Sequence, residues 1–125
     1  MKLSNSAKVA AGLAGLSSSS AYTILAGSYN TSLTTYTFES DKNIIGYGKQ
    51  HELPQGFAPS WIQESPVNDS VIAVCSEAFP GSVASTILED AESHKVVNSL
   101  PSGGDGPASG GFTADGNYFI AANVR

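Results

Sequence analysis

The sequence predicts an all-β fold made of short antiparallel strands that are separated by turns. Charged residues make up only 14% of the 125 residues, 13 residues are glycine, and Ser and Thr are abundant between the apolar runs. These runs are short, contain aromatic and β-branched residues, and are bounded by Gly, Pro, Asn or Asp, a pattern that is typical of strands. Helical periodicity is not found after Ala21.

Three strands are expected in the first part of the chain, at residues 22–28, 33–38 and 44–47. Gly27 ends the first, residues 30–32 make a turn, and the polar residues 41–43 break the second. Residues 50–58 are expected to form a connection, because they contain Pro54 and Gly56.

A complete group of four strands is expected next, followed by the start of a further group. The four strands are expected at residues 61–64, 71–75, 83–88 and 96–100, with turns at 66–69, 79–81 and 89–93. Residues 102–107, which contain three glycines and Pro107, then lead into a strand that includes Phe112, and residues 118–122 form the last strand.

An internal repeat relates the last two parts of the chain. Pro107 aligns with Pro59 (107 − 59 = 48), and at the same offset Ala121 aligns with Ala73. Both copies have a Gly/Pro start, a short mixed segment, a polar turn and a run of strand-forming residues. A period of this length, built from short strands, is typical of the blades of a β-propeller.

Three stretches resemble the seven-bladed lactonase family, which includes bacterial-type 6-phosphogluconolactonases and fungal carboxy-muconate cyclases. They are ILAGSYN, PSWIQESPVNDSVIAVCSE and PSGGDGPASGGFTADGNYFIAANV, within residues 22–125. PSGGDGP followed by ADGNYFIAANV is the most specific part. The resemblance implies a partial β-propeller with a first blade at about residues 22–50, a second at 59–101 and the start of a third at 107–125.

A propeller closes only when its last blade meets its first, and seven blades at this spacing need roughly 340 residues. The chain is therefore expected to be an amino-terminal part, a shortened product or a form that assembles. In the resembled family the inner strand of the first blade comes from the far carboxy-terminal end. One edge of the first blade is thus expected to be open, which permits oligomerisation through blade edges.

Candidate site residues lie on the inner strands and at their ends, where propellers usually bind ligands. The resemblance indicates Ser60, Trp61 and Ser109 as substrate-binding candidates and Glu77 as the catalytic candidate. Trp61 is interpreted mainly as a packing residue, with substrate stacking as the alternative. Glu77 is interpreted as a solvated loop carboxylate, with a general base or a binder of substrate hydroxyls as the alternative.

Ser109 stands where many members of the family have a histidine. A hydroxyl does not exchange protons near neutral pH as imidazole does, so this difference counts against catalysis. The histidines that are present, His51 and His94, are interpreted as exposed polar residues. They lack partners at metal-ligand spacing, and neither a metal nor a cofactor is expected.

The charge distribution bears on possible partners. The net charge is −5, which argues against nucleic acid and against an anionic membrane surface. The six basic residues are scattered: Lys2, Lys8, Lys42, Lys49, Lys95 and Arg125. The single cysteine, Cys75, has no internal disulfide partner and is expected to be a small buried residue at a strand end. The expected partner is a small-molecule lactone or a carbohydrate-derived ligand.

Residues 1–21 match the plan of a secretory signal: Lys2 and Lys8, an apolar run, and small residues before a cut at Tyr22. The alternative is a disordered leader, which would leave the protein in the cytoplasm. Two Asn-x-Ser/Thr sequons, at Asn30 and Asn68, would accept glycans in a secreted protein.

Three hypotheses about function follow from these observations. The resemblance implies hydrolysis or cycloisomerisation of a sugar-acid or muconate-type lactone, with no activity from this chain alone because later blades are missing. A secreted, non-catalytic binding module is the second hypothesis, since fold does not fix chemistry. A fragment without a function of its own is the third.

Overall fold

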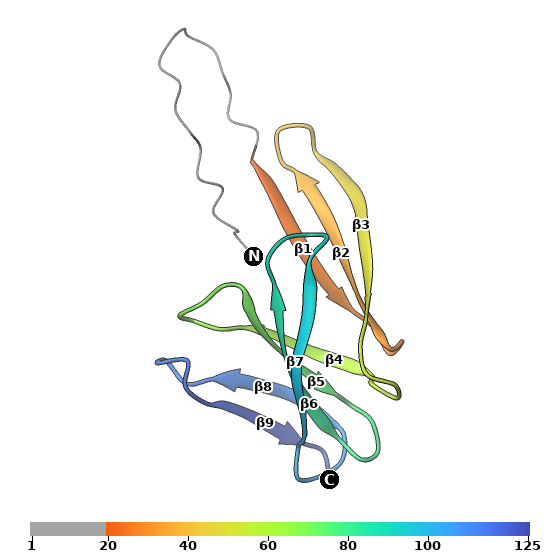
Figure 1. The fold of residues 1–125 in the computed structure, drawn as a ribbon, viewed down its shortest axis with the longest axis vertical. Helices are drawn as coiled ribbons and strands as arrows, with labels where there is room; N and C mark the ends of the chain where they lie inside the picture. The colour runs from red at the N-terminus through yellow and green to blue at the C-terminus, as the bar shows by residue number, and fades with distance from the viewer. Residues whose placement is uncertain (1–19) are drawn as a thin grey trace, which may run out of the picture.

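The computed structural model describes residues 20–125. Within this part the chain forms nine strands and no helix, so no helix there could cross a membrane. The strands make three antiparallel sheets, none of them closed (Figure 1). The all-β prediction is confirmed. The expected signal or leader lies outside the described residues up to residue 19, and Ala21, its last residue, is the first residue of β1.

The first sheet has the order β1-β2-β3 and contains β1 (Ala21–Gly27), β2 (Ser32–Glu39) and β3 (Ile44–Glu52). β3 is longer than expected, so residues 50–52, which were assigned to a connection, are strand. Pairing across the sheet explains the difference: Ser32 lies opposite Glu52 and Leu33 opposite His51. The pairing register shifts between Thr34 and Tyr36, as it does at a β-bulge.

The second sheet has the order β4-β5-β6-β7, and its four strands confirm the expected group. They are β4 (Pro59–Glu64), β5 (Val71–Ser76), β6 (Ser82–Leu88) and β7 (His94–Pro101). β7 begins earlier than expected, at His94 and not at Val96, because His94 pairs with Leu88 on β6.

β5 is buried on both of its faces. Ile72 and Val74 belong to the apolar cluster that also contains Leu33 of the first sheet. Ala73 and Cys75 point the other way, and the Cys75 thiol contacts the Ser109 carbonyl of the third sheet at 3.9 Å. A strand that is covered on both sides needs a continuous apolar run, which explains the sequence VIAVC. The predicted burial of Cys75 is confirmed.

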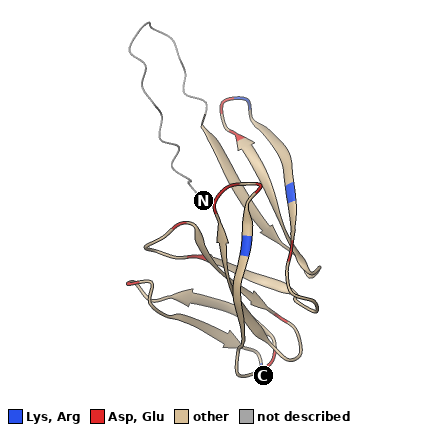
Figure 2. Cartoon of the chain, viewed as in Figure 1, with Lys and Arg blue, Asp and Glu red and all other residues tan. Residues whose placement is uncertain are grey.

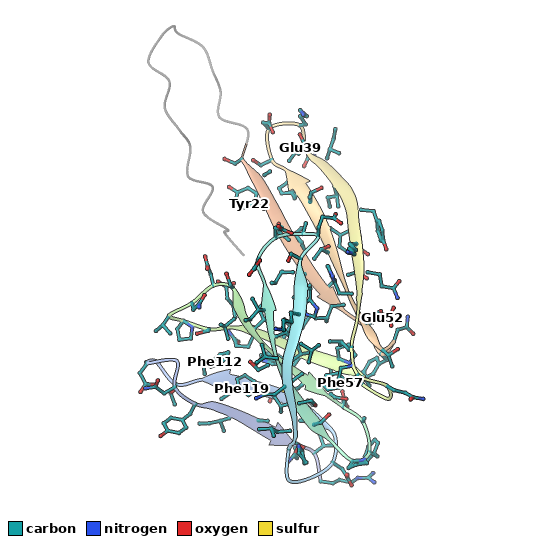
Figure 3. All side chains as sticks on the ribbon, in the orientation of Figure 1. Tyr22, Glu39, Glu52, Phe57, Phe112 and Phe119 are labelled. Carbon is teal, nitrogen blue, oxygen red and sulfur yellow. The ribbon has the colours of Figure 1, made fainter. Side chains whose placement is uncertain are left out.

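The third sheet pairs β8 (Pro107–Phe112) with β9 (Phe119–Asn123) and preserves the repeat. β8 begins one repeat after β4 (107 − 59 = 48), and β9 begins one repeat after β5 (119 − 71 = 48). Each hairpin also has a bulge at the same place, after Pro59 in β4 and after Pro107 in β8. The rings of Phe112 and Phe119 meet edge to face, with centroids 5.0 Å apart (Figure 3).

The three sheets lie side by side in chain order, and the first strand of each sheet contacts the first strand of the next. β4 contacts β8 on one side and β1 on the other, which places the second sheet between the other two (Figure 1). The buried apolar cluster lies between the first and second sheets. Charged residues lie mostly in loops and near strand ends (Figure 2).

Candidate functional site

The predicted site residues gather at one end of the sheets, where β1 ends and where β4 and β8 begin. Pro59 and Pro107 are the first residues of β4 and β8, and both are buried. Proline suits the first position of a strand, because it has no N–H to donate. A Cβ on Gly27 would lie 3.3 Å from the Pro59 carbonyl oxygen, so β1 ends against the start of β4. We call this region the proline end.

Glu77 follows the last residue of β5 and is half-buried at the proline end. Its backbone N–H donates to the Ala58 carbonyl at 2.9 Å, which fixes the main chain. Its carboxylate oxygen Oε2 accepts a 2.8 Å hydrogen bond from the Tyr29 hydroxyl. The Glu77 Cγ atom also lies close to Gly106, where an added Cβ would be 3.6 Å away. Glu77 is therefore held between the first and third sheets.

Ser60 and Ser109 lie on neighbouring strands at the same end. The Ser60 hydroxyl donates to the Pro107 carbonyl at 3.0 Å, so it links β4 to β8. Ser109 lies opposite Ala122, and its carbonyl accepts the contact from the Cys75 thiol. The hydroxyl of Ser60 is thus already used within the protein, and neither serine side chain supplies a group that exchanges protons near neutral pH.

Trp61 is on β4 directly opposite Cys75 and is 39% exposed. It lies outside the buried apolar cluster of the first two sheets. The preference for packing over substrate stacking stays a prediction, because the exposed part of the indole leaves room for either role.

The two sequons have exposed asparagines in loops: Asn30 between β1 and β2, and Asn68 between β4 and β5. Asn68 shapes its own turn, since its side-chain oxygen accepts from the Ser70 N–H at 3.1 Å. Their use as glycan acceptors stays a prediction.

The histidines were predicted to be exposed, and this prediction is wrong. His51 is on β3 and only 6% exposed, and His94, the first residue of β7, is half-buried. Both lie in the contact between the first sheet and the β6–β7 loop, and their ring centroids are 5.1 Å apart. No group of three or more His, Cys, Asp or Glu suited to a metal ion occurs within residues 20–125.

Two further residues at the proline end were missed by the sequence reasoning. Tyr29 bonds to Glu77, and the Arg125 guanidinium lies 6.0 Å from the centre of the Phe79 ring. The repeat contains the signal that would have found them. Tyr29 precedes Glu77 by one repeat (77 − 29 = 48), and Arg125 follows Glu77 by one repeat (125 − 77 = 48). A tyrosine, a carboxylate and a guanidinium thus stand at intervals of 48 residues, the spacing that relates β4–β5 to β8–β9, and each lies just after a strand.

Three depressions of about 430 to 480 Å³ lie near but outside this group of residues. The one nearest the proline end is lined by the 54–57 connection, Ala78 to Ser82 and the end of β7. None of the three is lined by Ser60, Trp61, Glu77 or Ser109.

Comparison of the chain with protein-family models, curated proteins and solved structures finds no match.

Proposed function

We propose that the proline end binds a lactone or the acid derived from it, in a protein of the lactonase-propeller type. One observation carries the proposal: Tyr29, Glu77 and Arg125 stand at intervals of 48 residues, and Tyr29 already bonds to Glu77. A carboxylate and a phenol suit the hydroxyls of a sugar acid. A guanidinium suits its carboxylate or phosphate.

The propeller architecture itself is part of this proposal. It is supported by the repeated spacing of the strands, by the bulges at equivalent places, and by first strands that lie side by side. In this interpretation the second sheet is a complete blade, the first sheet lacks its inner strand, and the third is the start of another blade. The ring would be seven-bladed.

Glu77 is the group at this end that can act as a base in lactone hydrolysis. The carboxylate takes a proton from water, the water oxygen bonds to the carbonyl carbon, and the ring C–O bond breaks with return of the proton to the leaving alkoxide. Stabilisation of the developing oxyanion requires N–H donors or a guanidinium. Arg125 and backbone amides are the donors at the proline end. The same carboxylate would move the proton in a cycloisomerisation.

The experiment uses the 125-residue chain and protein purified from its native source. Hydrolysis of 6-phosphogluconolactone is measured against its spontaneous rate. We expect the native-source protein to show an excess rate that Glu77→Gln in the corresponding gene reduces and Glu64→Gln does not. The chain alone is expected to show only the spontaneous rate, because it has no closed ring. An excess rate in that chain, lost on Glu77→Gln, would contradict this expectation.

A secreted, non-catalytic binding module is the second candidate. Ser109 favours it, because a hydroxyl stands where an imidazole would exchange protons, and both histidines lie instead at the β6–β7 loop. In this case calorimetry should show that 6-phosphogluconate binds to the native-source protein, while the hydrolysis assay should show no turnover of the lactone. If the native-source protein shows no binding and no turnover, both functions are excluded and a fragment without a function of its own is favoured. The mass of the native-source protein separates a ring from a shorter product.

A further inference from the structure

A pair of histidines joins the first sheet to the β6–β7 loop. His51 is on β3 and buried, and His94 begins β7 directly after the loop. Their ring centroids are 5.1 Å apart and the rings are tilted by 44°. The pair lies apart from the proline-end residues, so its role does not depend on the function proposed above.

Hydrogen bonds from β2 and β3 hold the loop at this point. The Ala91 carbonyl accepts from the Thr35 hydroxyl at 2.6 Å and lies 3.2 Å from His51 Nε2. His51 Nε2 also lies 3.3 Å from the Thr35 Oγ1 atom, so a proton on Nε2 would be shared between the Ala91 carbonyl and the Thr35 oxygen. The Lys49 ammonium donates to the Glu92 carbonyl at 3.2 Å. Two loop carbonyls are thus bound by three side chains of the first sheet.

No bonded carboxylate in the described part of the chain would offset a positive charge on either histidine ring. The Nε2 atom of His94 is buried and has no hydrogen-bond partner in the described part of the chain. Burial, and secondly the His51 ring, lower the pKa of His94 to about 4. Within residues 20–125 no carboxylate bonds to either ring. The charged residues on the elements packed against the pair are Lys49, Glu52, Glu89, Asp90, Glu92 and Lys95.

Two carboxylates adjoin Ala91 in sequence, of which Glu92 is exposed and Asp90 is occupied within the loop. Asp90 Oδ1 accepts from the backbone N–H groups of Glu92 and Ser93, each at 2.8 Å, and so shapes the turn. A proton added to His94 would therefore place a positive charge in a half-buried position beside the His51 ring, without a bonded carboxylate to offset the charge.

We propose that His51 and His94 form an acid-sensitive latch, which releases the β6–β7 loop from the first sheet when the pair takes up a proton. Release breaks the bonds to Ala91 and Glu92 and exposes Thr35 and the neighbouring buried Leu33 and Leu88. The first sheet then turns away from the second, while β4 and β5 stay paired.

The direction with pH follows from linkage. An exposed histidine has a pKa near 6.5, whereas His94 in the closed latch has a pKa of about 4. The open form therefore binds protons first as the pH falls. The latch is closed above pH 6.5 and loses stability between pH 6.5 and about 4. Because His94 is only half-buried, the opening equilibrium is expected to rise by about tenfold, and not more, between pH 7 and pH 5.

Amide hydrogen exchange of the full chain tests the latch, with rates corrected for the intrinsic effect of pH. The reporters are the amides of Glu89, which donates to Ser93 within the loop, and of Lys49, which donates to the same Thr35 oxygen that binds Ala91. Both bonds flank the contact and are expected to open when the loop leaves the first sheet. The reference is the amide of Ser65, which donates to Val71 in the second sheet. We expect the reporters to open about tenfold more at pH 5 than at pH 7 and the reference to stay unchanged.

Variants connect the effect to the histidines. His94→Phe keeps an aromatic ring that does not titrate, so the pH dependence of the reporters should disappear, and Glu92→Gln should preserve it. Persistence of the effect in His94→Phe would overturn the latch. Should that variant fail to fold, the ¹³Cε1 titration of His94 in the unaltered chain decides. A midpoint well below 6.5 supports the latch, and a midpoint near 6.5 overturns it.

Discussion

The Tyr29 hydroxyl donates a 2.8 Å hydrogen bond to the Glu77 carboxylate and so connects the loop after β1 with the loop after β5. The two residues stand 48 residues apart, the spacing that relates β4–β5 to β8–β9. This bond and the neighbouring negative charge raise the pKa of the Tyr29 phenol, because ionisation would remove the donor and place two anions together.

Glu77→Gln should therefore lower the pKa of Tyr29 toward its ordinary value near 10. The measurement is a ¹³Cζ titration of the tyrosines by NMR, with Tyr29→Phe to assign the resonance. Glu64→Gln, on β4, is the matched control and should leave Tyr29 unchanged. An unaltered Tyr29 titration in Glu77→Gln would show that the two side chains do not meet in solution.

Burial of β5 on both faces leads to a second prediction. Ile72 is 1% exposed within the apolar cluster, whereas Ile45 on β3 is 65% exposed. Ile72→Ala should lower the free energy of unfolding by about 2–5 kcal/mol, from lost burial and the cavity left behind. Ile45→Ala should cost less than about 1 kcal/mol. Urea denaturation followed by Trp61 fluorescence compares them. Equal costs would contradict the burial of the face of β5 that carries Ile72.

Local sequence predicted most of the strands because apolar runs and turn residues alternate along the chain. The internal repeat located β8 and β9 relative to β4 and β5. The end of β3 was missed because residues 48–52 (GKQHE) have weak strand propensity, and pairing with β2 overrides that local preference. Such pairing is a tertiary effect that propensity does not contain.

The environment of the histidines depends on the same tertiary contacts. His51 was expected to be exposed because it falls in the connection marked by Pro54 and Gly56, yet the β6–β7 loop, which lies far along the chain, covers it. Glu77 was identified from sequence, but its partner Tyr29 was not, since nothing near Glu77 in the chain indicates which distant loop lies beside it.

Two adjacent glycines on β8 give a third prediction. A Cβ on Gly110 would lie 2.4 Å from the Phe119 ring and 2.9 Å from the Ile120 carbonyl oxygen, whereas a Cβ on Gly111 would meet nothing within 4 Å. Gly110→Ala should destabilise the protein by about 1–3 kcal/mol, because the partner strand β9 must shift. Gly111→Ala should be neutral or slightly stabilising.

Urea denaturation of the two alanine variants checks this difference, and loss of the Phe112–Phe119 contact by NMR confirms its origin in Gly110→Ala. A Gly110→Ala variant as stable as Gly111→Ala would mean that β8 and β9 are not closely paired at this point.

Cys75 gives the last prediction. The thiol is fully buried between the second and third sheets, and burial raises its pKa to about 11. Since the thiolate is the reactive form, its population at pH 8 is about a hundredfold lower than that of an exposed cysteine. Burial also keeps a thiol-labelling reagent away from the sulfur atom. Labelling with an aromatic disulfide at pH 8 should therefore be at least about a hundredfold slower in the folded chain than in urea. Cys75→Ala gives the background, because the chain has no other cysteine. Equal rates with and without urea would show that β5 is open to solvent and that the third sheet does not cover it.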